Sequence, residues 1–134
     1  MSQASDTGGI LPVEECASEF ELRGWLERGE LVSLYERAAG FVHVGDEDFG
    51  ISMVEALAAG TPVVALARGG AKDIVRDGVD GILVAEPTVG AVRAAVRAVA
   101  STTWSPPDLA THAREFSRER FVERFRDYLA NATR

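Results

Sequence analysis

The 134-residue sequence has a single cysteine, Cys16, only five prolines and no long apolar run. One cysteine excludes an intrachain disulfide and any metal site built from several thiolates. No apolar stretch approaches the roughly 20 residues that a membrane-spanning helix needs. The first ten residues also have neither the basic nor the apolar region of a signal peptide. We therefore expect a cytoplasmic protein.

Basic residues are also few: 14 Lys and Arg stand against 21 Asp and Glu, giving a formal net charge of −7. This balance argues against a nucleic-acid partner, since such proteins carry a basic surface that neutralises phosphates. The hydrophobic fraction of 46% is ordinary for a globular chain, and the length fits one domain with a real core.

The chain divides into a polar segment, residues 1–17, and a domain, residues 18–134. We expect the first segment to be a mobile tail, with Cys16 an inert thiol at its end. Apolar spacing predicts helices over residues 30–39, 51–59, 69–75, 89–100 and 118–130, and strands over 41–44, 63–66 and 82–84. Residues 20–22 suit a further short strand, and 104–108 a proline-containing connection.

The alternation of continuous apolar strands with amphipathic helices is typical of an α/β fold. Strands without polar residues must be covered on both sides, as in parallel sheets. We therefore predict a Rossmann-like parallel sheet with helices on both faces. In such sheets ligands bind at the carboxyl ends of the strands, here residues 45–52, 67–73 and 85–88.

Residues 45–50 follow a predicted strand and precede a predicted helix. The backbone amides of Gly50, Ile51 and Ser52 would point out of that helix start without internal partners. The helix dipole adds partial positive charge there, so the position suits an anion such as a phosphate. Ser52 is equally typical of an ordinary first turn.

Two carboxylates frame this helix start. Glu47 precedes it in the loop, and Glu55 lies five residues after Gly50, about 7.5 Å along the helix axis. An ionised carboxylate can accept hydrogen bonds from both hydroxyls of a vicinal diol, so the pair could hold two sugars of one ligand. The alternative is that Glu47 only favours the helix dipole and Glu55 is a solvated helix residue.

Residues 41–65, FVHVGDEDFGISMVEALAAGTPVVA, resemble the donor-binding C-terminal lobe of GT-B retaining glycosyltransferases of the GT4 family. The likeness continues through residues 68–75, RGGAKDIV, where Asp73 stands in place of the family's Glu, and through the turn and strand of residues 77–84. Residues 47–51 and 112–121 look closest to the mannosyltransferase-like branch of polysaccharide and O-antigen assembly. The resemblance covers the chain from about Glu19 onward.

This resemblance implies transfer of a hexose, with mannose the candidate, from a GDP- or UDP-linked sugar to a glycan or lipid-linked acceptor with retention of configuration. It marks Glu47 as the catalytic residue that contacts the donor sugar and Glu55 as the residue that holds the ribose. The further donor-binding positions are Asp48, Phe49, Gly50, Ile51, Ser52, Gly69 and Gly70. Gly69 and Gly70 could equally be a turn that needs no ligand. We expect no metal and no separate cofactor.

The chain also departs from the GT-B pattern, because it corresponds to only part of the C-terminal lobe. The N-terminal lobe is missing, as are the first strands of the donor lobe, which carry the family's Arg and Lys for the diphosphate. Arg68 and Lys72 are the cations near the motifs, while Asp46 and Asp48 add negative charge. An unpaired sheet edge invites self-association or a partner polypeptide that supplies the missing lobe.

Two other functions therefore remain open: a non-catalytic nucleotide-sugar binding module, and a degenerate remnant that acts as an interaction domain. For the protein itself we expect the cytoplasm, with a peripheral position at the inner membrane face as the alternative.

The remaining singular residues have simpler interpretations. We expect His43 to be a satisfied core or edge histidine and His112 to lie on the surface of a polar helix. Trp25 and Trp104 are expected to be packing anchors. The mixed Arg and Glu residues of 114–126 indicate a solvated helix face with ion pairs four residues apart.

Overall fold

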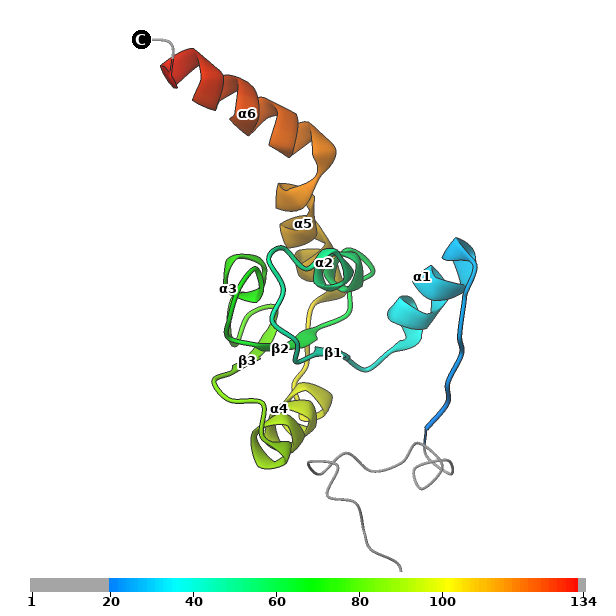
Figure 1. Cartoon of the computed structure of the whole chain (residues 1–134). Coiled ribbons are helices and arrows are strands. Elements are labelled where there is room, and N and C mark those ends of the chain that lie inside the picture. The colour runs from blue at the N-terminus through cyan, green and yellow to red at the C-terminus, as the bar shows by residue number, and fades with distance from the viewer. Residues whose placement is uncertain (1–19, 133–134) are drawn as a thin grey trace, which may run out of the picture.

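The computed structural model describes residues 20–132 (Figure 1). The predicted tail and Cys16 lie outside the described residues. The elements in chain order are α1 (Arg28–Arg37), β1 (Phe41–His43), α2 (Ile51–Ala58), β2 (Val63–Leu66), α3 (Ala71–Ile74), β3 (Gly81–Val84), α4 (Val89–Ser101), α5 (Pro106–Ala113), the 3-10 helix η2 (Arg114–Phe116) and α6 (Arg118–Ala132).

The strands form a parallel sheet in the order β1-β2-β3. Phe41 pairs with Val63, and Val63 pairs in turn with Gly81. Gly81 is required at this place, since an added Cβ would lie 1.8 Å from the Val63 carbonyl oxygen. All four residues of β2 are buried. The predicted α/β, Rossmann-like architecture is confirmed.

Helices cover both faces of the sheet, as predicted. Figure 1 shows α2, α3 and α5 on one side of the strands and α4 on the other. The first face buries the larger core cluster: Tyr35, Met53, Ala56, Leu57, Val63, Ala65, Ala71, Ile74, Val75, Leu109 and Ala113. The second buries Val64, Leu66, Val84, Ala95 and Val99. The alternation of side chains along β2 sends successive residues to opposite clusters.

Two expectations about local structure are wrong. Residues 20–22 form no strand, since no described strand lies beside them to supply hydrogen bonds. Helix α5 begins inside the expected 104–108 connection, at Pro106, because proline is well suited to a first helical position. Trp104 is a packing anchor as predicted, with its Nε1 donating to the Val99 carbonyl at 2.9 Å, but Trp25 is 88% exposed.

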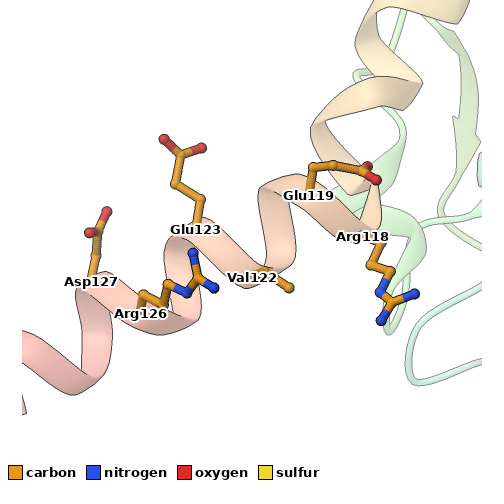
Figure 2. Close-up of a pocket in the computed structure, with 6 residues that line it drawn as sticks. All are labelled: Arg118, Glu119, Val122, Glu123, Arg126 and Asp127. Atoms are coloured by element: carbon orange, nitrogen blue, oxygen red, sulfur yellow. The ribbon is translucent and has the colours of Figure 1, made fainter.

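Helix α6 projects away from the rest of the domain (Figure 1) and buries none of its residues. Figure 2 shows a shallow hollow along it, lined by Arg118, Glu119, Val122, Glu123, Arg126 and Asp127. All six come from this one helix, so no second element encloses the hollow. Ion pairs lie near its start, but not at the predicted spacing of four residues: Arg120 contacts Glu123 three residues later at 2.6 Å and Glu115 five residues earlier at 3.1 Å.

A buried carboxylate, that of Asp80, ties α5 to the turn before β3. Asp80 is fully buried and accepts hydrogen bonds at 2.7 Å from both Nε and Nη2 of Arg76, and at 2.9 Å from the Arg76 amide. His112 Nε2 lies 2.8 Å from the Ile74 carbonyl oxygen and 3.4 Å from Asp80 Oδ2. The expectation of a surface histidine is therefore wrong: 14% of its side chain is exposed, because α5 packs His112 against the end of α3.

We predict that Asp80→Asn lowers the free energy of unfolding by about 2 kcal/mol at pH 7. Burial alone would raise the pKa of Asp80, but the hydrogen bonds from Arg76 and the nearby His112 outweigh it and hold this pKa below its ordinary value. The ionised Asp80 carboxylate therefore stabilises the folded state at neutral pH. This stabilisation is lost as the pH falls through the ordinary Asp range toward the pKa of Asp80 in the folded state.

Urea unfolding followed by circular dichroism at pH 7 and at about pH 3 would measure this difference. The difference in free energy of unfolding between the wild type and Asp80→Asn should be smaller at the lower pH. The exposed Asp127→Asn is the control, and an equal loss in both variants at pH 7 would contradict the assignment.

Candidate functional site

The loop that follows β1 lies at the carboxyl end of the sheet, where parallel α/β folds bind ligands. It borders an open hollow lined by Asp46, Glu47, Asp48, Phe49, Gly50, Ile51 and Ser52. The structure thus gathers the first group of predicted site residues around one hollow. Gly69, Gly70 and Glu55 do not line it.

The start of α2 leaves donors free, as the sequence predicted. Gly50 caps the helix with φ 98° and ψ 57°, and no side chain caps it. An added Cβ at Gly50 would also lie 2.1 Å from Met53 Cε. Within residues 20–132, no acceptor is found for the amides of Gly50, Ile51 and Ser52, whereas the next two amides bond back to the Gly50 carbonyl. Among the described residues these three amides are therefore free to donate to a ligand.

Gly69 and Gly70 bring the loop after β2 against the loop after β1. The Gly70 amide donates to the Glu47 carbonyl oxygen at 2.7 Å. A Cβ added at Gly70 would lie 2.0 Å from the Phe49 carbonyl oxygen, and one added at Gly69 would lie 2.2 Å from the Glu47 carbonyl oxygen. The Gly70 amide is therefore already used within the protein, which favours the turn interpretation for this residue.

Glu47 lies beside His43. The Glu47 Oε1 is 3.3 Å from His43 Nε2, with 46% of the glutamate side chain exposed and 21% of the histidine side chain. His43 lies at the end of an edge strand, as expected, and is partly buried, but it is not satisfied: its buried Nε2 has no hydrogen-bond partner of good geometry in the described chain. Sequence reasoning missed this contact, because a spacing of four residues indicates a contact only within a helix, and His43 ends a strand.

Glu55 lines a second hollow, between α1 and α2, together with Arg28, Leu31, Val32, Tyr35, Glu36, Ala58 and Ala59. Burial, and then the negative charge of Glu55, raise the pKa of the Tyr35 hydroxyl. Thr61 donates its hydroxyl to the Tyr35 carbonyl, which anchors α1 to the end of α2. The two glutamates thus border different hollows, and the start of α2 lies between them in the chain.

Few cationic side chains lie near these two hollows. Three carboxylates and no Lys or Arg line the hollow of residues 46–52. Arg68 pairs with Glu86 at 3.2 Å, and Lys72 is exposed on α3. No group of three or more His, Cys, Asp or Glu in residues 20–132 could hold a metal ion. The same residues include no helix long and apolar enough to cross a membrane.

The fold defines the class of protein: a Rossmann-like α/β domain whose loops at the carboxyl ends of the strands form the candidate site. Comparison with protein families then identifies the family. The model described as "Glycosyl transferases group 1" matches residues 14–120. The chain therefore belongs to this glycosyltransferase family, as the sequence resemblance indicated.

Curated relatives agree with this family. A D-inositol 3-phosphate glycosyltransferase from Geodermatophilus obscurus is 43% identical over 97 residues, which cover 70% of this chain and 22% of the relative. One from Mycobacterium sp. (strain KMS) is 54% identical over 65 residues, covering 47% of this chain and 15% of the relative. The chain thus spans about a fifth of the length of these relatives.

We predict that Gly70→Ala separates the two loops and lowers the free energy of unfolding by about 2 kcal/mol or more, since the new methyl group meets backbone atoms that cannot rotate away. The matched control is Gly90→Ala in α4, where an added Cβ meets nothing within 4 Å. That variant should be neutral, or more stable by about 0.5–1 kcal/mol. Thermal unfolding of both variants tests this, and equal behaviour would contradict it.

Proposed function

We propose that this chain is part of the donor-binding C-terminal lobe of a GT-B glycosyltransferase of the GT4 family, and that it binds a GDP- or UDP-linked hexose for transfer with retention of configuration. The observation that carries the proposal is the start of α2, where three unpartnered amides stand between two glutamates that border separate hollows. A nucleotide sugar has matching parts: a central diphosphate with a sugar on each side.

In this arrangement the diphosphate binds at the amides of Gly50, Ile51 and Ser52. Glu47 accepts hydrogen bonds from hydroxyls of the hexose in the hollow of residues 46–52. Glu55 accepts hydrogen bonds from both hydroxyls of the ribose in the hollow between α1 and α2. Phe49 and Asp48 line the hexose side. Gly69 and Gly70 support the loop rather than contact the diphosphate.

The leaving diphosphate gains negative charge as the glycosidic bond breaks, and preorganised dipoles at that position stabilise it. The free amides and the dipole of α2 supply part of this stabilisation, whereas Asp46, Glu47 and Asp48 oppose it. The GT-B pattern places an Arg and a Lys on preceding strands of the donor lobe. Each such charge-assisted contact is worth about 1.5–3 kcal/mol, so transfer requires those strands.

The acceptor would bind on the other lobe, across the cleft. The relatives' names favour a phosphorylated cyclitol such as D-inositol 3-phosphate over the glycan or lipid-linked acceptor that the sequence resemblance implied. Mannose stays a prediction from the sequence alone. The second candidate function, a non-catalytic nucleotide-sugar binding module, is favoured by the absence of cations from the hollow of residues 46–52. It differs in showing binding without transfer.

We predict that Glu55→Gln weakens binding of GDP or UDP at least about tenfold, because it replaces a charged acceptor for the ribose diol by a neutral amide. Isothermal titration calorimetry of the full 134-residue chain measures this. Glu119→Gln, on the exposed face of α6, is the control and should bind as wild type does. Binding that is equal in both variants would sink the ribose assignment.

The β1 edge of the sheet, which no strand within residues 20–132 covers, carries a second part of the proposal. Phe41 donates to the Pro62 carbonyl at 2.9 Å, so strand alternation turns the amide and carbonyl of Val42 away from β2. An apolar groove continues this edge toward α4, lined by Ala39, Gly40, Val42, Val64, Val96, Val99 and Ala100. We propose that a second copy of the 134-residue chain covers this edge.

Sedimentation velocity over a range of concentrations should then show self-association, and Val42→Lys should shift the chain toward monomer because a lysine blocks strand pairing at an edge. Val89→Lys replaces an exposed valine away from the edge and should leave the association unchanged. A wild-type chain that stays monomeric at high concentration would show that a second copy does not cover the edge, and would favour a partner polypeptide that supplies the missing strands.

A further inference from the structure

The imidazole of His43 is held in a row of aromatic rings along β1. Its ring is nearly parallel to that of Phe41, with 10° between the planes and 6.4 Å between centroids. Phe41 in turn meets Tyr35 edge-on at 5.5 Å. Tyr35 belongs to the buried core, so this row fixes the plane of the imidazole at the carboxyl end of the strand.

The fixed ring directs its Nε2 at the loop that bears Glu47. Gly45 leaves the space for it, since an added Cβ there would lie 3.2 Å from Nε2. The nitrogen is buried and unpaired, with the Glu47 carboxylate 3.3 Å away. Asp46 is not a competing acceptor, because its carboxylate points to Gly69, where an added Cβ would lie 2.8 Å from Oδ1. A buried polar nitrogen requires a partner, and the half-exposed Glu47 can rotate to accept from it.

We propose that His43 is a positioning residue for Glu47, an inference that rests on the proposed function. The Nε2–H group donates to one oxygen of the carboxylate and leaves the other free to accept from a hydroxyl of the hexose. A carboxylate that is already held loses less side-chain freedom when the sugar binds. His43 therefore sets the affinity for the hexose part of the donor and not for the nucleoside part, which binds at Glu55.

Two substitutions separate the donor group of His43 from its packing. His43→Phe keeps an aromatic ring beside Phe41 but removes the N–H, whereas His43→Gln keeps an N–H donor without the ring. Calorimetric titration of the full chain would use GDP, UDP, GDP-mannose and UDP-glucose. We expect His43→Phe to weaken binding of the sugar nucleotide about tenfold while binding of the free nucleotide changes less than about twofold, and His43→Gln to restore most of the loss.

Coupling between the two residues is measured by a double-mutant cycle. Glu47→Ala should lower sugar-nucleotide affinity by at least as much, because it removes the contact with the hexose itself. Adding His43→Phe to Glu47→Ala should cost little more, since the carboxylate that His43 positions is already gone. Nitrogen-15 NMR of the histidine rings gives a reading without ligand. The sequence has two histidines, so His112 is the internal reference. We expect the Nε2–H tautomer of His43 in the wild type and its loss in Glu47→Ala, with His112 unchanged.

The outcomes distinguish the inference from the proposed function. A wild-type chain that binds neither nucleotides nor sugar nucleotides overturns the proposed function, and the inference with it. Binding in which His43→Phe keeps the wild-type ratio of sugar-nucleotide to nucleotide affinity overturns the inference alone. Equal weakening of both kinds of ligand also overturns it, because it shows a merely structural role. A His43 ring signal that does not change in Glu47→Ala would also overturn the inference.

Discussion

The candidate site depends on one close contact between backbones, that of Gly69 and Gly70 with residues 47–49. The hydrogen bond from the Gly70 amide to the Glu47 carbonyl holds the loop after β1 against the loop after β2. Any side chain at either glycine would push the loops apart. Such a shift would move Glu47 away from His43 and disturb the turn that opens α2. The glycine pair therefore shapes the loop that bears Glu47.

The electrostatics of the hollow suit hydroxyl recognition better than phosphate binding. Three free amides and the dipole of α2 attract an anion, but each contributes only partial charge. Asp46, Glu47 and Asp48 line the same hollow with full negative charges. Carboxylates bind sugar hydroxyls well and repel phosphates, so under the proposed function this hollow favours the hexose. Neutralisation of the diphosphate would then fall to the Arg and Lys that the GT-B pattern places on preceding strands.

Features that depend on neighbouring residues in the chain could be predicted from the sequence. The run of residues 63–66 is apolar and branched, and β2 has these bounds. Features that depend on contacts between distant segments could not. Residues 20–22 have the composition of a strand but no described neighbour, and His112 meets Ile74 across 38 positions of sequence. The positions of Glu47 and Glu55 in the sequence predicted that both lie near the start of α2, but they could not show that Glu55 faces α1.

The separation of Glu47 and Glu55 into two hollows constrains the ligand more than their spacing in the sequence does. If both glutamates bordered one hollow, a single sugar could engage them together. Glu47 instead borders the hollow of the loop after β1, while Glu55 shares a hollow with Tyr35 of α1. Under the proposed function, a ligand that engages both glutamates carries two groups of hydroxyls with an anionic centre between them, as a nucleotide sugar does. A monosaccharide or a simple phosphate would engage only part of this arrangement.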